Sequence, residues 1–115
     1  MEPFFDRTGK VHSWIDLEGG RIVDLWGRHV ALISSNAIFD WEGRQIGWWH
    51  GDHARNLSGQ VAGFLRGAVA LGPVMPPLAP IPVKPPLLAT PPRPVLAMRR
   101  NRPSLATSWA PTLPF

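Results

Sequence analysis

Short apolar runs alternate with polar turns over the first 67 residues, and this pattern predicts β-strands. A pair of residues, apolar in three cases and mixed in the fourth, precedes each turn: Phe4-Phe5, Ile22-Val23, Ile38-Phe39 and Ala54-Arg55. A large apolar residue stands five positions after each turn glycine: Trp14, Leu32, Trp48 and Phe64. β-Branched and aromatic residues at this spacing indicate short antiparallel strands, and no segment predicts a convincing helix.

The turns repeat one motif, Asx-x-x-Gly. Its four copies begin and end at Asp6 and Gly9, Asp24 and Gly27, Asp40 and Gly43, and Asn56 and Gly59. Successive glycines are 18, 16 and 16 residues apart. The Asx side chain accepts hydrogen bonds from backbone amides just ahead, and Gly supplies the positive φ of a type I turn with a G1 bulge. Each motif therefore predicts a β-hairpin tip, and these eight residues are expected to be structural.

A lone hairpin is marginally stable, so the four hairpins must share a core. We expect an all-β domain over residues 1–67, a flower-like ring of four pseudo-symmetric hairpins with large apolar residues packed between petals. A small residue four positions after each glycine marks where backbones could approach closely: Ser13, Ala31, Gly47 and Gly63. Because about 67 residues bury only about 60% of their unfolded surface, we expect help from the apolar connector, the tail or a second protomer.

Residues 68–115 differ in composition and predict an apolar connector followed by an extended Pro/Arg-rich tail. Pro3 is the only proline before Pro73, and the other thirteen follow. Proline at this density excludes helices and central strands and favours polyproline II or irregular extended chain. The apolar stretch 63–72 reads either as a last strand or as a short buried connector.

Charge divides at the same place, and a basic tail on a neutral domain predicts an interaction arm. Through Gly67 the chain has seven basic and eight acidic residues, and the remainder has five basic residues and no acidic one. The net charge of +4 therefore belongs to the tail.

Four runs carry a resemblance to a known family: Phe5–Gly9, Leu25–Ala31, Gly43–Trp48 and Gly59–Phe64. Over roughly residues 3–67 the chain resembles the bacterial 4-fold beta flower domain. The tail ending in Arg102-Pro103-Ser104 and Ser108-Trp109 is similar to tails of that family. The resemblance implies a fold and carries over no activity or catalytic residue. One departure from the family pattern is Arg55, which stands where a strand-end aromatic residue is expected. This departure predicts a weaker fourth petal.

Candidate chemistry is sparse, and we expect neither an enzyme nor a cofactor. The absence of cysteine excludes disulfides, thiolate metal sites and a cysteine nucleophile. The serines lack a Gly-x-Ser-x-Gly elbow, and no Gly-rich loop opens a helix to hold phosphate. The segment His50–His53 offers two histidines and Asp52 to a metal, but zinc needs three or four ligands, so solvated loop histidines are the expected reading. The four Asx residues could be acid/base or calcium groups, but the turns already require them.

Candidate contact residues are found at turn tips and in the tail. We expect Trp14 and Trp48 in the core, while Trp26 and Trp41 fall in the middle of turns, where each is either exposed for contact or folded over the neighbouring petal. The tail candidates are Arg93, Arg99, Arg100, Arg102 and Trp109.

The leading hypothesis is a non-catalytic protein-interaction or assembly module. Its extended tail is expected to dock on a protein surface, which is that of the flower domain itself, a second copy of the chain, a partner or a larger complex. Deleting residues 73–115 is expected to abolish partner capture while the domain stays folded. The alternatives are nucleic-acid binding by the basic tail and glycan binding by Trp26 and Trp41. No transmembrane segment or secretory signal is predicted, and we expect a cytoplasmic protein or one peripheral to a cytoplasmic-side assembly.

Overall fold

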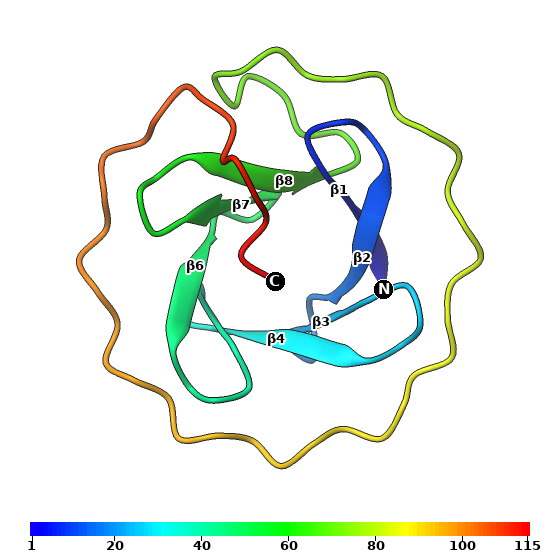
Figure 1. The fold of residues 1–115 in the computed structure, drawn as a ribbon, viewed down its shortest axis with the longest axis vertical. Helices are drawn as coiled ribbons and strands as arrows, with labels where there is room; N and C mark the ends of the chain where they lie inside the picture. Colours follow the sequence, from blue (N-terminus) through cyan, green and yellow to red (C-terminus); the bar gives the residue numbers. More distant parts are fainter.

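The fold is a closed barrel of eight antiparallel strands, as described for residues 1–115 by a computed structural model (Figure 1). The strands follow one another around the barrel in chain order: β1 (Glu2–Phe5), β2 (Val11–Asp16), β3 (Arg21–Val23), β4 (His29–Ser34), β5 (Ala37–Phe39), β6 (Gln45–Trp49), β7 (His53–Asn56) and β8 (Val61–Leu65). The barrel closes where β1 pairs with β8, with Phe4 opposite Leu65. The all-β class expected from the sequence is confirmed. The chain has no helix long and apolar enough to cross a membrane.

The Asx-x-x-Gly motifs lie at the tips of hairpins β1–β2, β3–β4, β5–β6 and β7–β8. The third is representative: the Gly43 N–H donates to the Asp40 carbonyl at 3.1 Å. The Asp40 Oδ1 atom accepts from the N–H groups of Glu42 and Arg44 at 2.9 and 3.0 Å. All four turn glycines have φ between 84° and 88°, the region where L side chains are strained. Each hairpin also shows a register shift beside its turn, as a bulge requires.

One cluster of buried residues fills the barrel interior. Every strand contributes at least one residue to it: Phe4, Ile15, Ile22, Ala31, Ile38, Trp49, Ala54, Ala62 and Leu65. The C-terminus closes this core. Leu113 and Phe115 pack against the cluster, and the Phe115 ring lies 5.6 Å from that of Phe4. The C-terminal end accordingly sits over the middle of the barrel in Figure 1.

The outer face of the barrel is packed as well, which explains the paired apolar residues before the turns. In each pair the first residue joins the interior cluster and the second joins an outer one: Phe5 and Val23 in one cluster and Phe39 in another. Trp14 and Trp48 belong to these outer clusters and are 5% and 3% exposed, so their expected burial is confirmed.

The stretch 63–72 combines both readings given to it. Its first residues complete β8, and beyond the strand Ala68 and Leu71 are buried in the first outer cluster. The chain then leaves the barrel and enters the tail.

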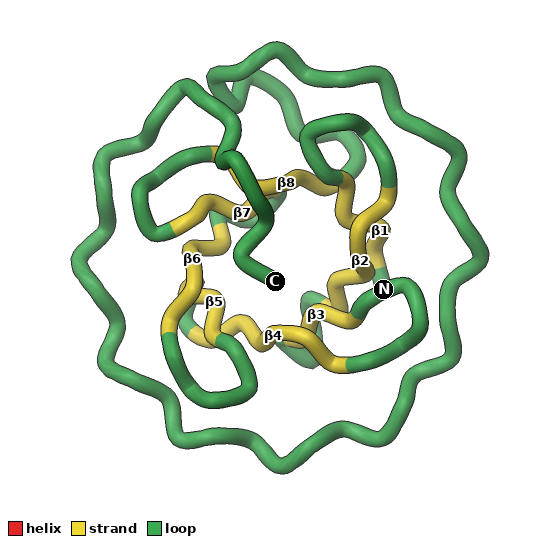
Figure 2. The backbone as a smooth tube through the Cα atoms, viewed as in Figure 1, coloured by secondary structure: helices red, strands yellow, loops and turns green.

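The tail travels round the outside of the barrel in one circuit without forming strands (Figure 2). At about 3.1 Å per residue, nine residues of extended chain span about 28 Å, and four such segments make a circle about 36 Å across. The molecule measures 38 × 36 × 22 Å, so the tail has the length needed to encircle it. We call residues 73–108 the tail ring.

Candidate functional site

Four backbone hydrogen bonds fasten the tail ring to the barrel, one at each Asx-x-x-Gly turn. In each bond an N–H of the tail donates to the carbonyl of a turn glycine: Ala79 to Gly9 at 2.8 Å, Leu88 to Gly27 at 3.3 Å, Ala97 to Gly43 at 2.8 Å and Ala106 to Gly59 at 3.1 Å. The donors are spaced nine residues apart along the chain. The turn glycines therefore serve two purposes, since they form the hairpin tips and also receive the tail.

The same glycines also accommodate tail carbonyl groups. A Cβ atom at any of the four would clash with a tail carbonyl oxygen: that of Pro77, Pro86, Val95 or Ser104. These residues again follow one another at intervals of nine. A side chain is thus excluded from each turn both by its positive φ and by the tail that covers it.

The tail sequence repeats with the same interval, a signal that the sequence analysis missed. Its units begin Pro76-Pro77-Leu78-Ala79, Pro85-Pro86-Leu87-Leu88, Pro94-Val95-Leu96-Ala97 and Pro103-Ser104-Leu105-Ala106. Since extended proline-rich chain has three residues per turn, an interval of nine returns the same face to the barrel. The first proline of every unit is accordingly buried or half-buried, with Pro85 the most enclosed. This repeat contains no turn or strand pattern, so it gives none of the signals that mark the hairpins.

The tail arginines lie along one part of the tail ring and do not converge on a single point. Arg99 donates to the Ser35 carbonyl at 3.0 Å, and the Arg100 backbone N–H donates to Gln45 Oε1 at 2.7 Å. The Arg102 guanidinium lies 4.8 Å from the centre of the Trp48 ring, within cation–π range. Arg93 borders a separate hollow beside Trp41.

The three candidate tryptophans have different surroundings. Trp26 is 68% exposed at its turn tip, with the Arg28 guanidinium 5.4 Å from its ring. Trp41 is half-buried and packs edge-on against His29 of β4, at 6.0 Å between ring centres. Trp109 lies beside β8, where its ring is 6.0 Å from that of Phe64. The structure therefore leaves Trp26 open at the surface and engages Trp41 and Trp109 within the chain.

Four apolar side chains of the tail ring are almost fully exposed. Val74, Val83, Val95 and Met98 are 90%, 92%, 93% and 92% exposed. Soluble monomers rarely expose large contiguous apolar patches, whereas single exposed residues are common. The four exposed residues of this protein are spread along the tail ring.

The Asx carboxylates are occupied by their own hairpins. Arg28 Nε lies 2.6 Å from Asp24 Oδ2, and Arg44 Nε lies 3.0 Å from Asp40 Oδ2. Burial raises the pKa of Asp40, but hydrogen bonds from the backbone and side chain of Arg44 and from the Glu42 N–H outweigh it and leave that pKa lowered. Hydrogen bonds from the backbone and side chain of Arg28 and from the Trp26 N–H likewise outweigh burial and lower the pKa of Asp24. A carboxylate held in this way is a poor general base, since it favours its charged, hydrogen-bonded state.

The sequence predicted solvated loop histidines in the segment His50–His53, but His53 is buried at the start of β7 and has partners within the chain. His53 Nδ1 lies 2.7 Å from Asp52 Oδ1, and Arg55 Nε donates to His53 Nε2 at 3.1 Å. The His50 and His53 rings stack at 4.9 Å. Both ring nitrogens of His53 are therefore used within the chain, which leaves neither free to bind a metal ion.

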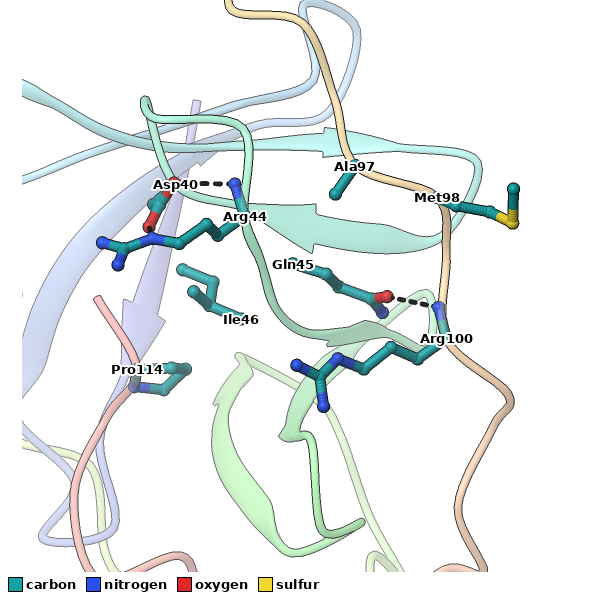
Figure 3. A pocket seen from close by; sticks show the side chains of 8 residues that line it. All are labelled: Asp40, Arg44, Gln45, Ile46, Ala97, Met98, Arg100 and Pro114. Atoms are coloured by element: carbon teal, nitrogen blue, oxygen red, sulfur yellow. Dashed lines mark hydrogen bonds and ion pairs between the residues drawn. The ribbon is translucent and has the colours of Figure 1, made fainter.

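Two hollows form between the barrel and the tail ring at the third and fourth hairpins. The first, about 480 Å³, is bordered by Asp40, Arg44, Gln45, Ile46, Ala97, Met98, Arg100 and Pro114 (Figure 3). In it Asp40 neutralises Arg44, and Gln45 holds the backbone of Arg100. The second, about 330 Å³, is lined by Trp48, His50, Arg55, Arg102, Pro103 and Leu105, and we call it the Arg55 pocket.

Arg55 has contacts in the structure that the sequence did not indicate. It is only 4% exposed, and its guanidinium joins the fourth hairpin to the connector and the tail. Nη1 donates to the carbonyls of Gly59 and Ala106 at 2.7 and 2.8 Å, and Nη2 donates to the Leu71 carbonyl at 3.1 Å. This departure from the family pattern is therefore a buried hydrogen-bonding centre, and the weaker fourth petal stays a prediction.

Comparison with known proteins gives one match. No curated protein and no solved structure matches the chain. The sequence profile described as "4-fold beta flower protein" matches residues 2–113, which include the tail ring as well as the barrel. The chain belongs to the 4-fold beta flower protein family.

Proposed function

We propose that the chain is a non-catalytic interaction or assembly module whose encircling tail presents apolar side chains to a protein partner. The observation that carries the proposal is the outward exposure of Val74, Val83, Val95 and Met98. These side chains are free to lose contact with water on binding, which is the main favourable term in most protein association.

We further propose that the chain is built from four units, each combining one hairpin with one nine-residue tail segment. The support is the matching set of four glycine-to-tail hydrogen bonds. In this architecture the inner edge of the tail is committed to the turns and the outer edge is left for a partner. The tail then acts as a fixed collar rather than as a loose arm, so a partner pays little ordering entropy in binding it.

The experiment places a photo-crosslinking side chain at position 83 of the full-length protein in cells that make it. We expect discrete crosslinked products that are lost when Val74→Gln, Val95→Gln and Met98→Gln are combined. The control combines Leu17→Gln and Val69→Gln, which are 48% and 74% exposed and lie outside the tail ring. Crosslinked products that still form in the triple variant would refute the proposal. Sedimentation of the purified protein shows whether the crosslinked partner is a second copy of the chain or another protein.

Nucleic-acid binding is the second candidate, because Arg99, Arg100 and Arg102 follow closely in a tail without acidic residues. Binding through phosphate contacts must weaken steeply with salt. Titration of a labelled single strand at rising salt tests this, with neutral substitutions at the three arginines as the matched variants. Affinity that is unchanged by those substitutions would exclude the basic tail as the binding surface. Glycan binding by Trp26 and Trp41 stays a prediction.

A further inference from the structure

The fourth hairpin differs from the other three in charge. At the position before the turn Asx, three hairpins have Phe5, Val23 and Phe39, and the fourth has Arg55. At the Asx position itself, three hairpins have aspartate and the fourth has the neutral Asn56. The first change adds a positive charge and the second removes a negative one, so both make this hairpin more positive.

The Arg55 charge is buried without a carboxylate in contact. Its hydrogen bonds go to three carbonyls and to the ring of His53, all of them neutral acceptors. Asp52 reaches it only through that ring, since it is bonded to the opposite nitrogen of His53. Burying a guanidinium in this way is costly unless a counter-charge is supplied. Arg28 and Arg44, by contrast, are each paired directly with a turn aspartate.

The Arg55 pocket brings a second guanidinium and a histidine ring close to this charge. Arg102 enters from the tail ring and stacks on Trp48, while His50 enters from the turn between β6 and β7. None of the six lining residues is acidic. Burial first, and then the neighbouring His53, Arg102 and Arg55, lower the pKa of His50 to about 4, against an opposing effect of Asp52. The groups that face His50 therefore form a positive environment.

The donors of this pocket suit an anion with several oxygen atoms. A guanidinium has five N–H groups, and four hydrogen bonds account for four of those of Arg55, which leaves one on Nη2. Arg102 makes no hydrogen bond or ion pair within the chain, so its guanidinium donors are available. Guanidinium groups match phosphate geometry well, and their bonds to it are charge-assisted.

We propose that the Arg55 pocket binds a small phosphate-bearing anion between Arg55 and Arg102, with the anion supplying the missing counter-charge. The volume of about 330 Å³ admits a phosphate with a small organic group. The anion would link the fourth hairpin to the tail ring, because Arg55 belongs to β7 and Arg102 to the tail. This site is separate from the outward apolar surface proposed for the protein partner.

The test is a titration of the full-length protein with inorganic phosphate and with phenyl phosphate, at constant ionic strength set with chloride. The readout is the ¹⁵N chemical shift of the His50 side chain. We expect a saturable shift with a Kd of about 1 mM or tighter, and a rise in the pKa of His50 when phosphate is bound. No saturable shift with either probe would overturn the proposal.

Variants separate the pocket from general attraction to a basic tail. Arg102→Gln should weaken phenyl phosphate binding by about tenfold or more, because it removes charge-assisted hydrogen bonds from an exposed residue that makes no hydrogen bond within the chain. Arg93→Gln removes the same charge from the tail outside the pocket and should bind like the parent protein. Equal weakening by both variants would overturn the proposal.

Two further measurements complete the test. Arg55→Met should abolish binding, and if this variant does not fold, Arg102→Gln alone decides the result. A single-stranded oligonucleotide serves as the last probe. Binding of the oligonucleotide without binding of phenyl phosphate would contradict the pocket and support nucleic-acid binding by the tail instead.

Discussion

Replacing Gly43 with alanine tests whether the tail is held at the hairpin turns. Gly43 has φ +88, and a Cβ there would clash with the Val95 carbonyl. Gly51 has the same φ of +88 but no heavy atom within 4 Å of its Cβ position. Gly51→Ala is therefore a matched control, which introduces the backbone strain without the clash.

The expected magnitudes follow from these surroundings. A left-handed conformation costs a non-glycine residue about 1–2 kcal/mol, which is the whole loss expected for Gly51→Ala. In Gly43→Ala the displaced tail also loses the hydrogen bond from Ala97 to Gly43, worth about 0.5–1.5 kcal/mol. Leu96, which packs against the second outer cluster, is displaced with it. We expect Gly43→Ala to cost about 2–4 kcal/mol of unfolding free energy in total.

Urea unfolding of both variants measures the difference, and amide hydrogen exchange locates it. The Ala97 N–H should lose protection in Gly43→Ala and keep it in Gly51→Ala. Equal losses of stability in the two variants, together with an Ala97 N–H that stays protected, would refute the view that the tail is fastened at the turn glycine.

Three other predictions follow from the same contacts. The Gly19 N–H and the Arg21 side chain hold the pKa of Asp16 below its ordinary value of 3.8, and hydrogen bonds do the same for Asp40. A depressed carboxyl pKa stabilises the fold above the unfolded value and loses this effect as pH falls through the folded one. The free energy of unfolding should therefore drop on acidification through and below pH 3.8, and it should drop less in Asp40→Asn. Asn56 caps the fourth turn in the same way, so asparagine is compatible with this turn. An identical pH profile for the variant and the parent protein would contradict the prediction. Deleting residues 73–115 removes partners from all three apolar clusters and one hydrogen-bond acceptor from Arg55. We therefore expect the remaining residues to unfold without a cooperative transition in circular dichroism. A cooperative transition at the parent midpoint would instead support the independent domain expected from the sequence. Trp26→Ala should change the free energy of unfolding by less than about 0.5 kcal/mol, since Trp26 is 68% exposed. Trp41→Ala should cost about 1 kcal/mol or more, since Trp41 packs against His29 and an outer apolar cluster; equal effects in thermal unfolding would contradict this placement.

The sequence determined the local structure of this protein because its signals act over a few residues. An Asx side chain caps backbone amides two and four positions ahead, and a glycine permits positive φ, so the hairpin tips are readable without knowing any distant contact. The paired apolar residues likewise indicated strands, although they did not reveal that both faces of the barrel are packed.

Only the tertiary structure decided where the tail lies and what Arg55 does. The nine-residue period of the tail is present in the sequence, yet its meaning depends on the distance between neighbouring turns around the barrel. From the sequence, Arg55 looked unfavourable because two of its carbonyl acceptors, those of Leu71 and Ala106, lie far from it along the chain. The third acceptor is the nearby Gly59 carbonyl. Hydrogen bonds and packing between distant segments depend on how the chain closes on itself, and that closure is not encoded in any local pattern.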